Sequence, residues 1–291
     1  MAVRFASLVL ASLLMVSTAA WQSEPVSVMS FNIRYGTARD GDNQWSNRRE
    51  LLFDVVREEN AAILALQEAL DFQVDEILAA APAYAAVGVG RNDGIRAGEH
   101  ASILFMKDRF RVGESGTFWF SDTPSVPGSR SWGNNVVRIC TYARFVDRAG
   151  AAFWVFNVHL DHESQPSRER SVLLLKERIV ARAYPQEPVI VTGDFNAGES
   201  NPAMLPLIGP SSPSTAPFRD TFRALHPDEK TVGTANNFIA DRVDGEKIDY
   251  ILVQPGAEVL RAAIVRTNRD KRVPSDHFPV TATIKLPVPA K

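Results

Sequence analysis

Two apolar runs that end in short polar clusters constrain the fold of this sequence most strongly. Residues 189–192, Val-Ile-Val-Thr, lead into Gly-Asp-Phe-Asn at 193–196, and Ser-Asp-His at 275–277 leads into an alternating apolar segment that extends to Leu286. The first run is typical of a buried strand and the second of a strand with one face in a core. Acid, amide and imidazole groups at strand ends can hold a hard cation and move a proton. The pattern predicts a hydrolytic site at a sheet edge.

Strand and helix signals alternate along the chain, and strands dominate near its end. We expect strands at 26–31, 63–66, 84–89, 101–105, 112–120, 137–146, 153–160, 189–192, 248–253, 258–265 and 278–286. A first helix is expected with Asn47 as its N-cap, a second at 72–81 before Pro82, and a third capped by Ser167. This order predicts mixed sheets covered by helices in one domain.

Strand parity places several polar residues on apolar faces. Residues two apart share a face, so Asp249, His159 and Glu68 each lie on the apolar side of their own run, and an extended chain points Asp194 and Asn196 the same way. Burying such groups costs free energy unless they have partners. One such residue is usually a satisfied core group or a strand-end cap, but several at the ends of different runs predict a common site.

Six short segments, taken in order, resemble the endonuclease/exonuclease/phosphatase superfamily, which includes DNase I-like nucleases, sphingomyelinases and inositol polyphosphate 5-phosphatases. They are Ser-Phe-Asn at 30–32, Leu-Gln-Glu at 66–68, Asn-Val-His-Leu-Asp at 157–161, Gly-Asp-Phe-Asn at 193–196, Ile-Asp-Tyr-Ile at 248–251 and Ser-Asp-His-Phe-Pro-Val at 275–280. The resemblance implies a DNase I-like fold, a two-sheet α/β sandwich with mixed sheets flanked by helices. It also implies a Mg²⁺-dependent phosphoesterase.

The resemblance assigns three residues to the metal. Glu68 looks like the main metal carboxylate, with Asn32 beside it and Asp276 as the second acid. Mg²⁺ prefers a few protein oxygens together with water and substrate phosphate, which such a set provides. Mn²⁺ is an alternative occupant.

Five further residues are assigned to catalysis in the same way. Asp249 and His277 resemble an acid–imidazole dyad in which the carboxylate fixes the tautomer. Asp194 and Asn196 would position the attacking water and hold a phosphoryl oxygen. His159 would contact the phosphoryl oxygens or help protonate the leaving group. The general base is left open.

Two details bear on the branch of the family. Exonuclease III-like nucleases carry an acid two residues after the asparagine that corresponds to Asn32, and this chain has Arg34 there. The Asn-x-His-Leu setting of His159 is similar to the DNase I, sphingomyelinase and phosphatase branches. Residues 116–129 resemble a bacterial subgroup with poorly defined substrates.

Other polar and aromatic residues have two interpretations. Arg138 could clamp a phosphate or form a surface ion pair, and His162 is expected to be exposed. Trp45, Trp119 and Trp132 could stack on a base or sugar, or pack in the core or at its rim. Glu99 could reach the site from the start of a strand.

The N-terminus has the pattern of a signal peptide. Arg4 precedes an apolar segment at 5–16 and small residues at 17–20, which predicts cleavage near Ala19 or Ala20. A membrane anchor is the alternative, but the apolar run is too short to span a bilayer. We expect residues 1–20 to be the signal peptide and 21–291 the catalytic domain, secreted or periplasmic, with no transmembrane segment. Cys140 is the only cysteine, so no intramolecular disulfide can form.

The charge pattern weighs against tight non-specific binding of nucleic acid. The formal net charge is −2, without a basic run, although this does not exclude a nuclease. The sequence therefore predicts an exported monomer that hydrolyses a phosphodiester or phosphomonoester by metal- and His-assisted attack of water. Candidate substrates are nucleic acid, a nucleotide, a phospholipid headgroup or a phosphorylated glycan. The alternatives are an extracellular DNase I-like endonuclease, or a non-catalytic binding module, which would not need the complete residue set.

Overall fold

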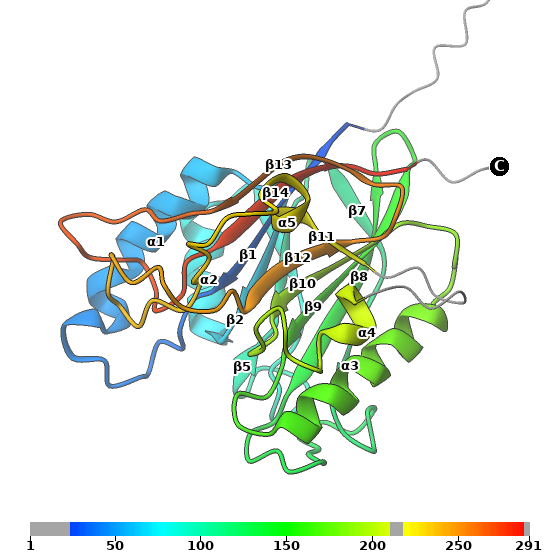
Figure 1. Ribbon diagram of the computed structural model, residues 1–291, viewed down its shortest axis with the longest axis horizontal. Coiled ribbons are helices and arrows are strands. Elements are labelled where there is room, and N and C mark those ends of the chain that lie inside the picture. Colours follow the sequence, from blue (N-terminus) through cyan, green and yellow to red (C-terminus); the bar gives the residue numbers. More distant parts are fainter. Residues whose placement is uncertain (1–23, 210–217, 288–291) are drawn as a thin grey trace, which may run out of the picture.

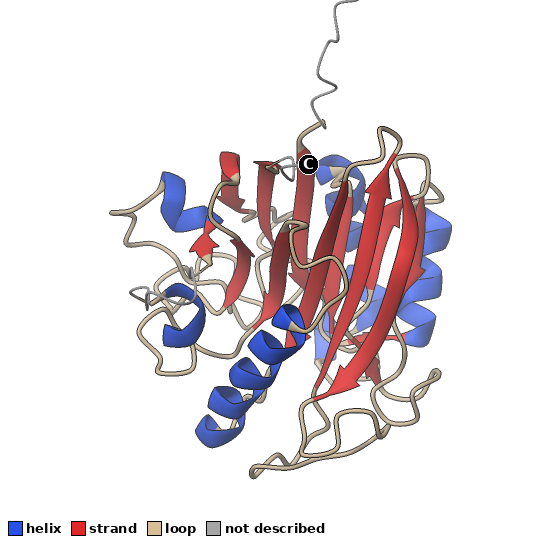
Figure 2. Ribbon diagram, turned by 90° about the vertical axis from the view of Figure 1, so that its right-hand side faces the viewer, coloured by secondary structure: helices blue, strands red, loops and turns tan. Residues whose placement is uncertain are grey.

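Two six-stranded mixed sheets pack face to face, with helices on their outer faces, in the computed structural model of this chain (Figures 1 and 2). The structure describes residues 24–209 and 218–287, so the predicted signal peptide, 1–20, lies outside the described residues. The arrangement confirms the predicted two-sheet α/β sandwich. Within the described ranges, no helix has the length and apolar character needed to cross a membrane.

The first sheet has the order β13-β14-β1-β2-β6-β4. Its strands are β1 (Val26–Asn32), β2 (Ile63–Gln67), β4 (Tyr84–Val87), β6 (Ile103–Met106), β13 (Glu258–Ile264) and β14 (Val280–Lys285). Strands β1 and β2 are parallel, whereas β14 runs antiparallel to β1. The ends of β1 and β2 therefore meet the start of β14 at one edge.

The second sheet has the order β11-β12-β10-β9-β8-β7. Its strands are β7 (Phe110–Trp119), β8 (Ile139–Asp147), β9 (Ala152–His159), β10 (Val189–Asp194), β11 (Arg219–Asp220) and β12 (Asp249–Val253). Parallel strands β9 and β10 end beside the start of antiparallel β12. A separate small pair joins β3 (Ala69–Leu70) to β5 (Glu99–His100).

The helices are α1 (Trp45–Glu59), α2 (Asp71–Ala80), α3 (Gln165–Val180), α4 (Leu205–Ile208) and α5 (Thr221–Leu225), with a 3₁₀ turn, η1, at Gly41–Asn43. Two predicted caps were wrong. The side chain of Asn47 donates back to the carbonyl of Asp42 at 3.1 Å, and α1 begins earlier, at Trp45. Ser164, not Ser167, caps α3, because the Ser164 hydroxyl accepts from the Ser167 N–H at 3.3 Å.

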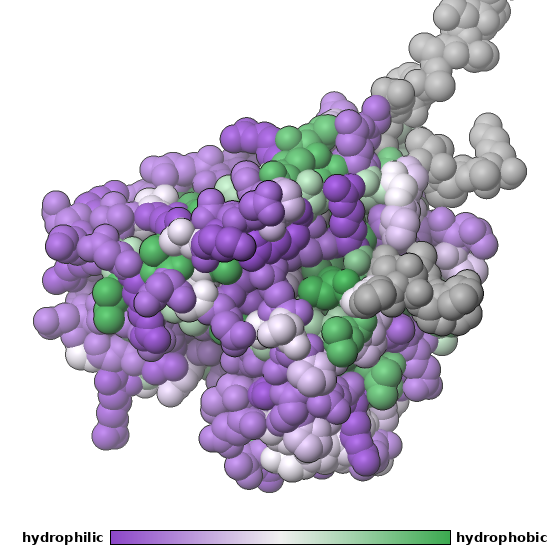
Figure 3. Space-filling model, in the orientation of Figure 1, coloured by the Kyte–Doolittle hydropathy of each residue, from purple (hydrophilic) through white to green (hydrophobic). Residues whose placement is uncertain are grey.

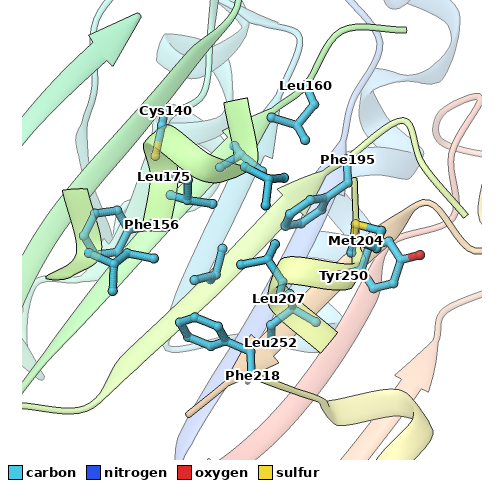
Figure 4. Close-up of a cluster of buried hydrophobic side chains, with 14 of the residues drawn as sticks. Cys140, Phe156, Leu160, Leu175, Phe195, Met204, Leu207, Phe218, Tyr250 and Leu252 are labelled. Atoms are coloured by element: carbon cyan, nitrogen blue, oxygen red, sulfur yellow. The ribbon is translucent and has the colours of Figure 1, made fainter. Parts of the chain in front are cut away.

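Three apolar clusters hold these layers together. One lies between the sheets and includes Val28 and Val155. A second packs α1 and α2 against the outer face of the first sheet. The third packs α3 and α4 against the second sheet and includes Phe156, Leu175 and Phe195 (Figure 4). Complete burial of each such side chain contributes about 1.5–3 kcal/mol, so packing fixes the strand ends that carry the site.

A polar layer separates the inter-sheet core from the sheet edge. Gln67 Nε2 donates to Asn157 Oδ1 at 2.7 Å and to Ser30 Oγ at 3.2 Å, while Asn157 Nδ2 donates to the Leu66 carbonyl at 2.8 Å. These fully buried groups bond to one another across the two sheets, and Gln67 Oε1 is left without a partner. The layer fixes the separation of the sheets directly beneath the site.

Candidate active site

The predicted site residues meet at one edge of the sandwich. Asn32 ends β1, Glu68 follows β2, and His159 and Asp194 end β9 and β10. Asp249 begins β12, and Asp276 and His277 lie just before β14. Asp194 is in register with both His159 and Asp249. Opposed strand directions therefore bring together residues that are far apart in the sequence.

Asp249 and His277 form a buried hydrogen-bonded pair. His277 Nδ1 donates to Asp249 Oδ2 at 2.9 Å, and His277 Nε2 lies 3.9 Å from Asp194 Oδ2. Burial opposes protonation of His277, but the charge and hydrogen bond of Asp249 outweigh it and raise the His277 pKa well above its usual value. The pair therefore holds an imidazolium whose free nitrogen faces a second carboxylate.

The Asp194 carboxyl group has a pKa far above the usual value for an aspartate. Burial, followed by repulsion from Asp249, raises its pKa to about 7. Asn196 N donates to Asp194 Oδ1 at 2.8 Å and Asn32 Nδ2 donates to Oδ2 at 2.9 Å. A buried carboxyl group with this pKa can take up a proton or pair with a cation near pH 7.

Glu68 reaches the site through a left-handed backbone conformation. Its φ is 60°, so the side chain leaves the strand pattern of Leu66, which packs under α1 and α2. The parity prediction was therefore wrong for Glu68. Asn32 Nδ2 donates to Glu68 Oε1 at 3.1 Å, and the Tyr35 N–H donates to Oε2 at 3.2 Å. Asn32 turns its amide nitrogen toward the carboxylates and its oxygen toward Arg34 N, at 3.0 Å.

Asn196 also departs from the expected extended conformation. Its φ is 48°, and its side chain donates to the Leu160 carbonyl at 3.0 Å instead of continuing the direction of Asp194. It lines the same pocket nevertheless. A loop that turns after β10, and not strand alternation, places it there.

Arg34 lies two residues after Asn32 and lines the same pocket as Glu68 and Asp276. It donates to both carboxylate oxygens of Asp40, at 2.9 and 3.0 Å, and its Nε lies 3.8 Å from Asp276 Oδ2. Burial raises the pKa of Asp276, although His277 opposes the shift. Arg34 thus places a positive charge beside the second predicted metal acid.

Arg138 is a buried part of the site, not a surface residue. Its Nη1 lies 2.9 Å from His159 Nε2, its Nη2 lies 2.7 Å from His162 Nδ1, and its Nε lies 3.6 Å from Asp161 Oδ2. Burial, aided by the Arg138 charge, lowers the pKa of His159 well below its usual value. The pKa values of His159 and His277 are therefore shifted in opposite directions, which suits the two residues to different proton-transfer roles.

The site residues surround a cavity of about 410 Å³. Its walls include Arg91 and Glu99, which pair at 2.5 and 2.7 Å. Glu99, at the start of β5, reaches the site as the sequence suggested, whereas Arg91 lies in a loop where no periodic pattern identifies it. Trp45 and Trp119 are instead buried, with their indole N–H groups bonded to Glu76 and to the Arg91 carbonyl.

The donor set fits a hard divalent cation. Carboxylates of Glu68, Asp194 and Asp276 line one cavity, and repulsion among buried acids is relieved by a cation. Among the described residues, the group that offers three ligand atoms within 4.8 Å of one another is Asp194, Asp249 and His277. That group already uses an Asp249–His277 hydrogen bond, and imidazole suits softer metals than Mg²⁺. The three carboxylates of Glu68, Asp194 and Asp276 do not meet that spacing, although carboxylate oxygens are the ligand type that a hard divalent cation prefers.

Comparison with known proteins identifies the family. The model of the Endonuclease/Exonuclease/phosphatase family matches residues 29–277. The chain belongs to this family, whose members are metal-dependent phosphoester hydrolases.

Solved structures with similar sequences span most of the chain. An endonuclease/exonuclease/phosphatase from Bacteroides vulgatus is 32% identical, with a TM-score of 0.81 over 91% of this chain and 100% of that one. The mannosyl-6-phosphatase Bt3783 of Bacteroides thetaiotaomicron is 31% identical, with a TM-score of 0.78 over 89% and 99% of the two chains. The uncharacterized protein L388 of Acanthamoeba polyphaga mimivirus is 30% identical over 54% of this chain, which spans about 60% of that curated relative.

Proposed function

We propose that this protein is an exported, Mg²⁺-dependent hydrolase of a small phosphate ester, with a phosphorylated sugar as the leading substrate class. The observation that carries the proposal is one cavity lined by the carboxylates of Glu68, Asp194 and Asp276 together with the imidazoles of His159 and His277. A binding module has no need of this combination.

Glu68 and Asp276 would hold the metal, and Asn32 beside them would position Glu68 through its amide nitrogen. When bound, Mg²⁺ would neutralise phosphoryl charge and support the leaving oxygen. Asn32 also bonds to both Glu68 and Asp194, which fixes the proposed metal ligand Glu68 relative to the proposed proton-transfer group Asp194. Mn²⁺ is an alternative occupant because it accepts the same oxygen ligands.

Asp194 and the two histidines provide the proton-transfer groups. Asp194 Oδ2 lies 3.6 Å from His159 Nε2 and 3.9 Å from His277 Nε2, so a phosphoryl group bound here would contact all three. Asp194 and Asn196 would orient the attacking water. His277, held by Asp249, would donate a proton, and His159 beside Arg138 would contact the phosphoryl oxygens.

The size and charge of the site favour a small substrate. Arg91, Glu99 and Arg138 form part of the cavity wall, and the chain carries a net charge of −2. A similar protein, 31% identical, is a mannosyl-6-phosphatase. These observations support a sugar phosphate over a long nucleic acid, which requires an extended basic surface.

Export and a monomeric state complete the proposal. The N-terminal pattern supports secretion or a periplasmic location, and the mature chain should begin after Ala19 or Ala20. The face shown in Figure 3 is mostly hydrophilic, with small separate hydrophobic patches, which supports a monomer.

A substrate screen tests the proposed function. Phosphate release or cleavage would be measured with Mg²⁺ and with Mn²⁺ on mannose 6-phosphate, p-nitrophenyl phosphate, bis(p-nitrophenyl) phosphate, DNA, RNA, phosphoinositides and sphingomyelin. We expect the highest kcat/KM on the sugar phosphate. Efficient cleavage of DNA or a diester with no release from monoesters would contradict the proposal.

A further inference from the structure

A second groove begins where the phosphate cavity ends. Tyr35 lines the cavity, and the next residue, Gly36, is the first of a loop that lines the groove through Ser46, with Phe72 on the other side. The groove has a volume of about 610 Å³. Tyr35 also donates its N–H to Glu68, so the surface is continuous from a predicted metal acid to Phe72.

Phe72 is exposed but fixed in place. Its side chain is 40% exposed at the start of α2. A Cβ atom at Gly36 would lie 2.6 Å from Phe72 Cζ, so the ring rests directly against the loop backbone. The neighbouring, fully buried Gln73 accepts from Gly36 N at 2.7 Å and donates to the Arg34 carbonyl at 3.1 Å. The ring and the loop therefore form one rigid platform.

The groove combines an aromatic side chain with a mostly uncharged polar rim. Thr37, Gln44 and Ser46 are exposed and line the same groove as Phe72. A pyranose ring matches such a surface, because its C–H face packs on an aromatic ring while its hydroxyls bond to polar side chains. Among the described residues that line the groove, only Arg39 is basic, so a nucleic-acid backbone would find a single phosphate partner.

We propose that this groove binds the sugar unit next to the phosphorylated one, so that the preferred substrate is a phosphorylated oligosaccharide and not a free sugar phosphate. The inference rests on the proposed function. Because the groove shares no lining residue with the phosphate cavity, its contacts add to substrate selection without altering the catalytic groups.

The test compares two substrates and four proteins. The substrates are methyl α-mannoside 6-phosphate and a mannobiose with the same 6-phosphate on its terminal residue. The proteins are the wild type, Phe72→Ala, Phe72→Tyr and the control Leu173→Ala, which removes an exposed apolar side chain on α3. We expect the wild type to favour the disaccharide in kcat/KM by about tenfold, the scale of one aromatic stacking contact. Phe72→Ala should abolish this preference through KM, with the monosaccharide unaffected.

The remaining outcomes separate the two claims. Phe72→Tyr and Leu173→Ala should keep the preference. Turnover of the monosaccharide with no wild-type preference for the disaccharide, or an equal loss on both substrates in Phe72→Ala, would overturn this inference alone. Turnover of neither substrate, in a protein that hydrolyses a different phosphate ester, would overturn the sugar-phosphate assignment and this inference with it.

Discussion

Asp249 and His277 act on each other at the scale of single residues. Their 2.9 Å hydrogen bond is buried, and the raised pKa of His277 depends on Asp249. We predict that Asp249→Asn and His277→Ala each lower kcat on the order of 10²-fold or more. The double variant should be little worse than His277→Ala alone, because the pair works as a unit. Steady-state kinetics of the three variants check this, and multiplied losses would make Asp249 a structural acid.

His100, another single residue, should make the folding stability of the protein depend on pH. Burial lowers its pKa below the usual 6.5, so the unfolded chain binds a proton more readily than the folded chain. Stability should therefore fall as the pH drops below about 6.5, with the sign set by the extra proton in the unfolded state. Thermal unfolding between pH 7 and 5 should show a smaller decrease in Tm for His100→Asn than for the wild type. The exposed His226→Asn is the control, and an unchanged slope in His100→Asn would refute the assignment.

For residues inside strands, strand alternation correctly predicts which face of the sheet each side chain lies on. His159 and Asp249 follow strand alternation and lie on the inter-sheet face, beside Val155 and Ile251 of the shared core. It fails for Glu68 and Asn196, because each has a positive φ that no alternation rule predicts. The family resemblance identified Glu68 and Asn196 as site residues, and only the structure shows where their side chains point.

Helix α1 is coupled to the site at the scale of elements. Arg48, 4% exposed, donates to the carbonyls of Ile33 at 2.7 Å, Pro274 at 2.9 Å and Arg34 at 2.9 Å. These bonds tie α1 to the end of β1 and to the segment before Asp276. Burial lowers the pKa of Arg48 to about 10, which leaves it charged at pH 7.

Removing the Arg48 side chain, which bonds α1 to these three carbonyls and is called the Arg48 clamp below, should lower both stability and activity. We predict that Arg48→Met lowers the free energy of unfolding by about 2–4 kcal/mol, because several buried carbonyls lose their donor. The kcat should also fall under conditions where the variant is fully folded, since Asp276 and Asn32 lose their common support. Arg49→Met, at the next and more exposed position, should change stability by less than about 0.5 kcal/mol. Urea unfolding and kinetics would decide, and equal effects at both positions would exclude the Arg48 clamp.

Elements with a strong apolar pattern were predictable, and short ones were not. The major strands and the helices α1–α3 lie where the sequence places them, with shifted ends. Strands β3, β5 and β11 and helices α4 and α5 were missed, because two to five residues carry too little periodicity. Loop 90–98, which supplies Arg91, is fixed by tertiary contacts such as the bond from the Trp119 indole to the Arg91 carbonyl.

The molecule as a whole carries little charge with which to hold a polyanion. With a net charge of −2, it should release few counterions on binding single-stranded DNA. We predict a log–log dependence of affinity on salt with a slope of about −0.7 to −1.4, as for one or two phosphate contacts on a single strand. Fluorescence anisotropy across a salt series measures this slope. A slope of about −5 or steeper would indicate an extended nucleic-acid-binding surface on the protein and would favour the nuclease alternative.

Dependence on a metal held by Glu68 tests the central claim most directly. Phosphate release from the best substrate would be followed in wild-type protein and in Glu68→Gln, first after EDTA treatment and then across a Mg²⁺ titration. The wild type should be inactive without metal and regain its full rate with Mg²⁺, because the buried acids need a cation to organise the phosphoryl group. Glu68→Gln should lose most activity and recover part of it only at high Mg²⁺. Full-rate turnover by the metal-free protein, or an unchanged Mg²⁺ requirement in Glu68→Gln, would contradict the account.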